Sequence, residues 1–298
     1  MNKNLLIILS FVSLWISSIV SETYETFLGL FLIISFGILH GSNDILLLQK
    51  NIKINFNTIS QIQILTFYVA TILVIISGFY LLPQLALLSF VFISAYHFGE
   101  QHWNIKLPHS KIVIKHSIHI SYGLSVLLGL FILNIDQVRE IIYSICNFNI
   151  THEQIIICLL ASGSILIASL AYSYYKKWLS TTDLLYEILI GVILYIIFSV
   201  STLIWGFAIY FIFWHSLPSL NDQIQYVYGN TATTSVKKYI LKALPYWAVS
   251  IIGLGLFYFI LKDEKLLYAI LFSFIAAITF PHAYVIYKTF KHKKTLPN

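Results

Sequence analysis

Four histidines lie near the ends of long apolar stretches, where a nitrogen lone pair can do chemistry. They are His40 in Gly-Ile-Leu-His-Gly, His97 in Ala-Tyr-His-Phe-Gly, His215 in Phe-Trp-His-Ser and His282 in Phe-Pro-His-Ala. Neutral imidazole is a common transition-metal ligand, and it brings no charge that low-dielectric surroundings would have to balance. Ionisable groups in such surroundings are costly and usually mark functional sites. We therefore expect these four histidines to bind a metal.

The composition shows what kind of chain must position these histidines. Of the 298 residues, 58% are hydrophobic and 10% are charged, and the mean hydropathy is +0.83. A soluble domain cannot bury so much apolar surface in one core, so the sequence predicts an all-α, polytopic helical bundle in a lipid bilayer. The longest interval that is not apolar, residues 221–240, leaves no room for a soluble domain. We expect one membrane domain over residues 1–298.

The apolar stretches predict ten transmembrane helices, since about 20 apolar residues cross a hydrocarbon core of about 30 Å. The seventh and eighth helices come from one stretch, Leu184 to Leu217, that is too long for a single helix and has only weak break signals. The ten predicted spans are 4–20, 24–48, 60–82, 84–103, 112–133, 153–175, 183–200, 202–220, 240–261 and 266–288.

The basic residues favour this division of the stretch. With ten helices, all 18 Lys and Arg residues except Arg139, Lys262 and Lys265 fall on one side of the membrane. Short loops rich in Lys and Arg stay in the cytoplasm, so both termini are predicted to be cytoplasmic. The net charge of +6 thus reflects topology, and no nucleic-acid partner is expected.

Two apolar or amphipathic segments need separate interpretation. The first stretch, which follows Lys3, also has the form of a cleaved signal peptide, but we favour a first transmembrane helix. Residues 136–150 combine Arg139 and Glu140 with aromatic residues, which predicts an interfacial helix on the outer surface.

All four histidines belong to helices that this topology orients in the same direction. Each lies about 13–16 residues from the predicted helix start, or about 20–24 Å at 1.5 Å per residue. The four imidazoles are therefore expected at one depth, in the cytoplasmic third of the membrane. A single membrane histidine most often bonds a neighbouring helix, but four at one level are what a metal needs. Cys146 and Cys158 have no metal-type spacing, so no thiolate site is expected.

Other polar residues close to the histidines are candidates for supporting roles. We expect Asp44, which follows His40 by one turn, to hold an imidazole in one tautomer by hydrogen bonding rather than to bind the metal itself. Glu100 and His102 continue the His97 helix and receive the same supporting role. A carboxylate or a further histidine is left open as an additional ligand, the candidates being His102, His116 and His119.

Aromatic side chains surround the histidines and predict a pocket for a long apolar substrate that arrives through lipid. Tyr96, next to His97, is the candidate catalytic residue beside this pocket. The residues predicted to line the pocket are Phe98, Trp103, Phe213, Trp214, Phe280 and Tyr284.

In their order and spacing, the histidine motifs resemble those of the Brp/Blh family of bacterial and archaeal membrane β-carotene 15,15'-dioxygenases. The resemblance spans residues 37–284 and rests on His40-Gly41 with Asp44, Tyr96-His97-Phe98-Gly99, Trp214-His215-Ser216 and Pro281-His282. It implies an oxidoreductase in the bacterial inner membrane, with iron(II) held by these histidines. It also implies that O2 and β-carotene are the substrates, that two retinal molecules are the products, and that a rhodopsin receives the retinal.

Two positions depart from the pattern of the family that the chain resembles. Some members carry another histidine one turn after the position of His215, where this chain has Ser219. Relatives also have an aspartate where this chain has His102. The ligand set is therefore not carried over whole, although four histidines are still available.

Two other kinds of function stay open for membrane histidines. In a haem protein, pairs of them would be axial ligands, and in an ion or proton carrier they would form a relay. A two-iron desaturase or hydroxylase is disfavoured, because the chain lacks the HxxxH and HxxHH boxes typical of that class.

Overall fold

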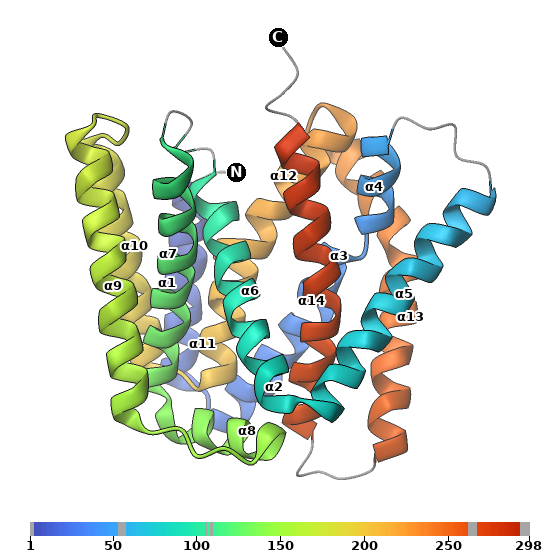
Figure 1. Ribbon diagram of the computed structural model, residues 1–298, viewed down its shortest axis with the longest axis horizontal. Coiled ribbons are helices and arrows are strands. Elements are labelled where there is room, and N and C mark those ends of the chain that lie inside the picture. Colours follow the sequence, from blue (N-terminus) through green and yellow to red (C-terminus); the bar gives the residue numbers. More distant parts are fainter. Residues whose placement is uncertain (1–2, 53–57, 105, 108–109, 262–266, 293–298) are drawn as a thin grey trace. The chain divides into compact units, whose positions relative to one another are not determined.

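The computed structural model describes residues 3–52, 58–104, 106–107, 110–261 and 267–292, and all regular structure in these ranges is helical. Lys262 and Lys265 lie outside the described residues. The elements are α1 (Lys3–Ile19), α2 (Glu22–Leu32), η1 (Ile33–Gly37), α3 (Ile38–Gly41), α4 (Asp44–Ile52), α5 (Thr58–Leu81), α6 (Pro83–Trp103), α7 (Ile112–Leu133), α8 (Ile135–Cys146), α9 (His152–Tyr175), α10 (Thr181–Val200), α11 (Leu203–Ile209), η2 (Tyr210–Ser216), α12 (Leu217–Tyr228), α13 (Thr233–Leu261) and α14 (Leu267–His292), where η denotes a π-helix (Figure 1).

These helices form two compact units. Unit 1 comprises Met1–Ile33, Val91–Tyr143 and Phe148–Pro218. Unit 2 comprises Ile34–Phe90, Ser144–Asn147 and Ser219–Asn298. The single membrane domain that the composition predicts stays a prediction.

A helix is present at each of the ten predicted spans. Among the described residues, seven helical stretches are long and apolar enough to cross a membrane: Glu22–Lys50, Ile62–Leu81, Ile112–Leu133, His152–Tyr175, Thr181–Val200, Leu203–Tyr228 and Thr233–Leu256. The other predicted spans correspond to α1, α6 and α14. The chain is thus a helical, multi-pass type of membrane protein, whereas ten crossings and cytoplasmic termini stay predictions.

The long apolar stretch is divided at Ser201 and Thr202, as predicted. Both residues take an extended backbone conformation, with ψ angles of 158° and 157°. Side chains accept hydrogen bonds from the backbone N–H groups at the start of the next helix. The Thr202 N–H donates to Glu25 Oε2 (2.8 Å), and the Leu203 N–H donates to Gln137 Oε1 (3.0 Å). Such partners replace the water that lipid cannot supply to a helix end. The prediction of two helices here is confirmed.

Unit 1 is organised around α7, which packs against α9 and α10 (Figure 1). The backbones of α6 and α7 also touch. A Cβ atom added to Gly99 would lie 1.8 Å from the His119 carbonyl oxygen, and one added to Gly123 would lie 1.9 Å from the Ala95 carbonyl oxygen. Small residues permit this close approach between membrane helices. The contact brings the histidine-bearing part of α6 beside the histidines of α7.

Unit 2 is organised around α14, which packs against α3, α4, α5 and α13 (Figure 1). Leu47 of α4 and the α14 residues Val285 and Ile286 form one buried apolar cluster. Phe79 and Phe90 form another with the same helix. The first cluster holds α4, and the second holds α5, against the helix that carries His282.

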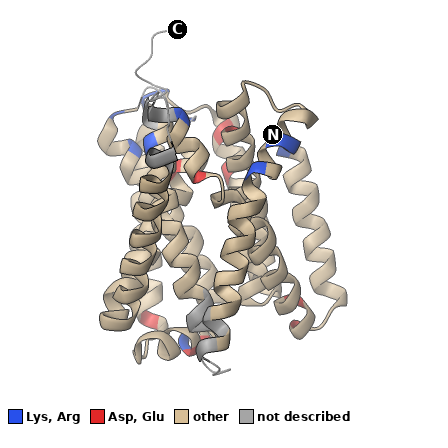
Figure 2. Ribbon diagram, turned by 90° about the vertical axis from the view of Figure 1, so that its right-hand side faces the viewer, with Lys and Arg blue, Asp and Glu red and all other residues tan. Residues whose placement is uncertain are grey.

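Charged residues lie mostly near helix ends in both units, and the helix middles are apolar (Figure 2). In unit 1, Lys111 and Lys115 stand at the start of α7, a helix of 22 residues or about 33 Å. Its other end leads into α8, where Arg139 pairs with Asp136 at 3.6 Å. The helix predicted within residues 136–150 is therefore present as α8, and its interfacial position stays a prediction.

Candidate metal centre

In unit 1, His97 of α6 and His215 of η2 form a pair that we call the unit 1 pair. Their ring centroids lie 4.7 Å apart, with the ring planes at 75°. Both side chains are buried, with 2% and 1% of their surface exposed. Imidazole–metal bonds are about 2 Å long, so two rings at this separation can each direct a nitrogen to one ion.

Aromatic rings hold the unit 1 pair in place. The Phe211 ring stacks on His215, with centroids 5.6 Å apart and planes at 12°, and the Phe98 ring lies 4.6 Å from the same imidazole. The Trp214 Nε1–H donates to Ser10 Oγ of α1 at 3.0 Å, which ties this turn to a neighbouring helix. The turn itself is π-helical, a local widening that is frequent at functional sites.

In unit 2, His40 of α3 and His282 of α14 form the unit 2 pair. Their centroids lie 4.3 Å apart with the planes at 77°, and both side chains are buried. The His282 Nδ1–H donates to Asp44 Oδ1 at 2.7 Å, and His40 Nδ1 lies 3.3 Å from the Gly37 carbonyl oxygen. Hydrogen bonds at Nδ1 favour the tautomer in which Nε2 carries the lone pair, which is how metal-binding histidines are commonly oriented.

The carboxylate of Asp44, which contacts His282, is itself held by a second partner. The Tyr68 Oη–H donates to Asp44 Oδ2 at 2.8 Å, so Tyr68, Asp44 and His282 form a chain. The sequence predicts one continuous helix over residues 24–48, and the structure differs from this prediction. A turn follows α3, because Asn43 is buried and donates from Nδ2 to the Tyr239 carbonyl oxygen at 2.8 Å. Asp44 therefore begins a new helix and reaches α14 instead of continuing the face of His40.

Tyr96 and the two α7 histidines form a separate cluster in unit 1. Tyr96 Oη lies 2.6 Å from His116 Nδ1, and the Tyr96 ring lies 5.6 Å from the ring of buried His119. The two α7 histidines, which the sequence leaves open as further ligands, therefore gather around Tyr96.

His102 lies in an ionic network that the sequence does not suggest. The His102 Nε2–H donates to Glu187 Oε2 at 2.7 Å, and Lys106 Nζ donates to Glu187 Oε1 at 2.5 Å. Burial lowers the pKa of Lys106, and the nearby Glu187 carboxylate opposes this shift. Glu187 is 85 residues away from His102 in the chain, so spacing could not reveal it. Glu100 is partly buried on the same helix as His102.

The six aromatic residues predicted to line a pocket have different surroundings. Phe98 packs against both histidines of the unit 1 pair, and Trp214 bonds Ser10. Tyr284 is 58% exposed, so its ring faces away from the core of unit 2. The others are partly buried Phe213, fully buried Trp103, and Phe280, which packs beside Phe79 and Phe90.

A protein-family model described as "Beta-carotene 15,15'-dioxygenase" matches residues 31–289, which is most of the chain and includes both histidine pairs and Asp44. No curated protein and no solved structure matches the chain significantly.

Proposed function

The chain belongs to the β-carotene 15,15'-dioxygenase family, and from this premise we propose that it uses O2 to cleave the central 15,15' double bond of β-carotene into two retinal molecules. The observation that carries the proposal is the family match over residues 31–289, because it takes in all four motif histidines. We also propose that the protein works in a bacterial inner membrane and passes retinal to a rhodopsin.

We propose iron(II) as the metal and assign His40, His97, His215 and His282 as ligands of a single ion. The donor chemistry fits, because imidazole suits iron and four such ligands leave positions open for O2. Burial and short ring separations within each pair support this assignment. When bound, iron(II) would supply the redox chemistry that lets O2 react with a polyene.

The protein's own residues would orient the ligands and keep water away. In unit 2, the chain from Tyr68 through Asp44 holds the proton on His282 Nδ1. In unit 1, the Phe98 and Phe211 rings pack on His215 and exclude water from it. Exclusion of water protects reactive intermediates from hydrolysis. Tyr96, held by His116, is our candidate for a hydrogen bond to oxygenated polyene.

The direct test is expression in cells that accumulate β-carotene. The proposal expects the cells to lose their yellow colour and to gain retinal, measured by chromatography of the extracted pigments. His152→Ala serves as a control, because His152 is exposed at the start of α9. Persistent colour with correctly inserted protein would overturn the proposal.

A further inference from the structure

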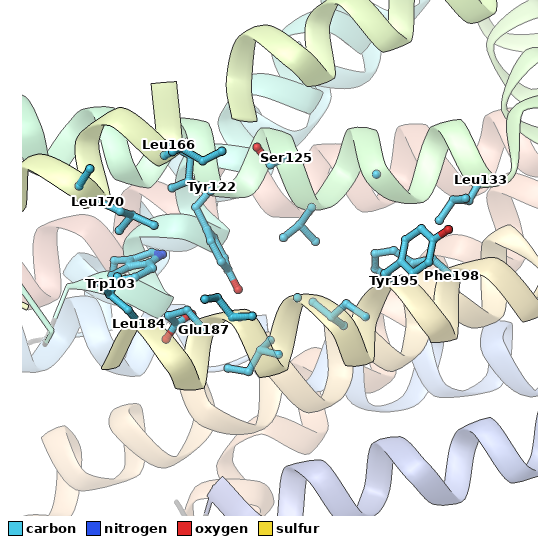
Figure 3. A pocket seen from close by; sticks show the side chains of 18 residues that line it. Trp103, Tyr122, Ser125, Leu133, Leu166, Leu170, Leu184, Glu187, Tyr195 and Phe198 are labelled. Atoms are coloured by element: carbon cyan, nitrogen blue, oxygen red, sulfur yellow. The ribbon is translucent and has the colours of Figure 1, made fainter. Parts of the chain in front are cut away.

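Unit 1 contains a cavity of about 530 Å³ between α7, α9 and α10. This volume lies within the range of about 300–1,000 Å³ typical of ligand pockets. Apolar side chains such as Val126, Leu166 and Leu194 make most of its wall, and none of the described residues that line it is a histidine. Figure 3 shows Trp103, Tyr122 and Glu187 at one end of the cavity, and Leu133, Tyr195 and Phe198 at the other.

The cavity is long and narrow. Its lining runs along α7 from Tyr122 to Leu133 and along α10 from Leu184 to Phe198, or about 17–21 Å at 1.5 Å per residue. Dividing the volume by this length gives a cross-section of about 25–31 Å². A single chain of conjugated carbon atoms fits such a shape.

Two buried hydrogen-bond donors stand at one end of the cavity. Trp103 is fully buried and Tyr122 is 7% exposed, and neither Trp103 Nε1 nor Tyr122 Oη has a hydrogen-bond partner within the described part of the chain. Buried donors without partners are costly, and the indole N–H can only donate. These two groups therefore suit a ligand that ends in an acceptor oxygen.

The charges at this end favour a neutral acceptor. Glu187 lines the cavity, and its carboxylate already binds Lys106 and His102. An ionised fatty acid would bring a second carboxylate to a place where the Lys106 ammonium is already engaged by Glu187. A carbonyl oxygen carries no such penalty.

The cavity opens on the outer surface of unit 1 between α9 and α10. Among its lining residues, Ile167 of α9 is 70% exposed, and Ile188 and Tyr195 of α10 are each 62% exposed. Both helices are apolar enough to cross a membrane, so this opening would face lipid. An apolar ligand can then enter or leave through the bilayer.

We infer that this cavity binds one slender apolar aldehyde, with its carbonyl oxygen at Tyr122 Oη and Trp103 Nε1. The identity of the aldehyde, a retinal molecule released by cleavage, rests on the proposed function. Trp103 follows His97 by six residues on α6, or about 9 Å along the helix. One lining residue of this product-binding site thus belongs to the helix that carries one candidate metal ligand.

The test is a titration of the full-length protein in lipid nanodiscs with all-trans-retinal, in the absence of carotenoid. Retinal binding is measured by the quenching of tryptophan fluorescence. Gly129 lines the cavity, and a Cβ atom added there meets no atom within 4 Å. The leucine side chain of Gly129→Leu would therefore occupy the cavity without disturbing the helices, and it should weaken retinal binding at least tenfold. Gly163→Leu is the matched control: its Cβ also meets no atom within 4 Å, but Gly163 of α9 does not line the cavity. Equal binding by both variants would overturn the inference.

A second substitution tests the polar end of the cavity. Tyr122→Phe should weaken retinal binding roughly three- to tenfold, the worth of one hydrogen bond. It should leave unchanged the binding of a polyene hydrocarbon of the same length that lacks the oxygen. Tyr195→Phe, at the other end of the cavity, should bind retinal with the affinity of the wild-type protein. If palmitate competes with retinal at equal affinity, the cavity is a lipid groove and the inference is wrong.

These measurements need no turnover, so they separate the two proposals. Retinal binding that depends on Gly129 and Tyr122 in a protein that does not cleave carotene would overturn the proposed function alone. If the protein cleaves carotene but Gly129→Leu and Tyr122→Phe leave its retinal affinity unchanged, the cavity assignment alone would be overturned.

Discussion

The two histidine pairs have similar ring geometry but are held in different ways. In the unit 1 pair, His215 is held by the Phe98 and Phe211 rings. In the unit 2 pair, His282 is held by a hydrogen bond to the buried carboxylate of Asp44. Stacking orients a ring without changing its charge, whereas a carboxylate raises the basicity of the imidazole that it bonds. We therefore expect the unit 2 pair to depend on charge and the unit 1 pair to depend on packing.

The largest expected effect tests whether the two pairs serve one ion. Elemental analysis of purified protein should find one iron per chain, and His97→Ala or His282→Ala should each remove both the iron and the cleavage activity. The loss of iron affinity should exceed the roughly 10–100-fold loss that follows from removing a residue that only hydrogen-bonds a ligand. His152→Ala should retain iron. Two irons per chain, with one kept in each single variant, would show that the pairs bind metal separately.

Asp44→Asn tests the charge in the unit 2 pair. The amide keeps the shape of the side chain but removes the negative charge that Asp44 presents to His282. Iron affinity should fall by about 10–100-fold, measured by competition with a chelator. An affinity within twofold of the unchanged protein would show that the carboxylate contributes only shape.

Tyr68→Phe tests the outer link of the same chain. It removes one hydrogen bond to Asp44 Oδ2 and should cost about 1 kcal/mol, which is roughly fivefold in iron affinity. Tyr80→Phe is the matched control, because Tyr80 lies on the same helix and is 87% exposed. An equal change in both variants would contradict a specific role for Tyr68.

Phe211→Leu tests the packing in the unit 1 pair and should have an effect about as small as that of Tyr68→Phe. Leucine keeps an apolar side chain but removes the ring that stacks on His215, an interaction worth about 0.5–1.5 kcal/mol. Iron affinity should fall by roughly two- to tenfold. Phe92→Leu, at a 46% exposed position of α6, should leave it unchanged. A loss as large as that of Asp44→Asn would remove the distinction between the two pairs.

Much of the helical fold is predictable from the sequence, because apolar runs of membrane length form helices wherever lipid supplies no hydrogen bonds. The division at Ser201 and Thr202 is also predictable, since charge distribution and length both require it. The four histidines and Asp44 stand out for the same reason: polar groups are rare in such stretches. The family follows from the order of their motifs.

Only the tertiary structure decides which groups meet. Asp44 and His282 are 238 residues apart, and His102 and Glu187 are 85 apart, so spacing could not pair them. The π-helical turns before His40 and around His215 depend on packing that no local pattern reveals. The cavity beside Tyr122 exists because three helices leave a gap that their side chains do not fill. Hydropathy is a property of single segments, whereas hydrogen-bond partners and cavities depend on how several segments pack.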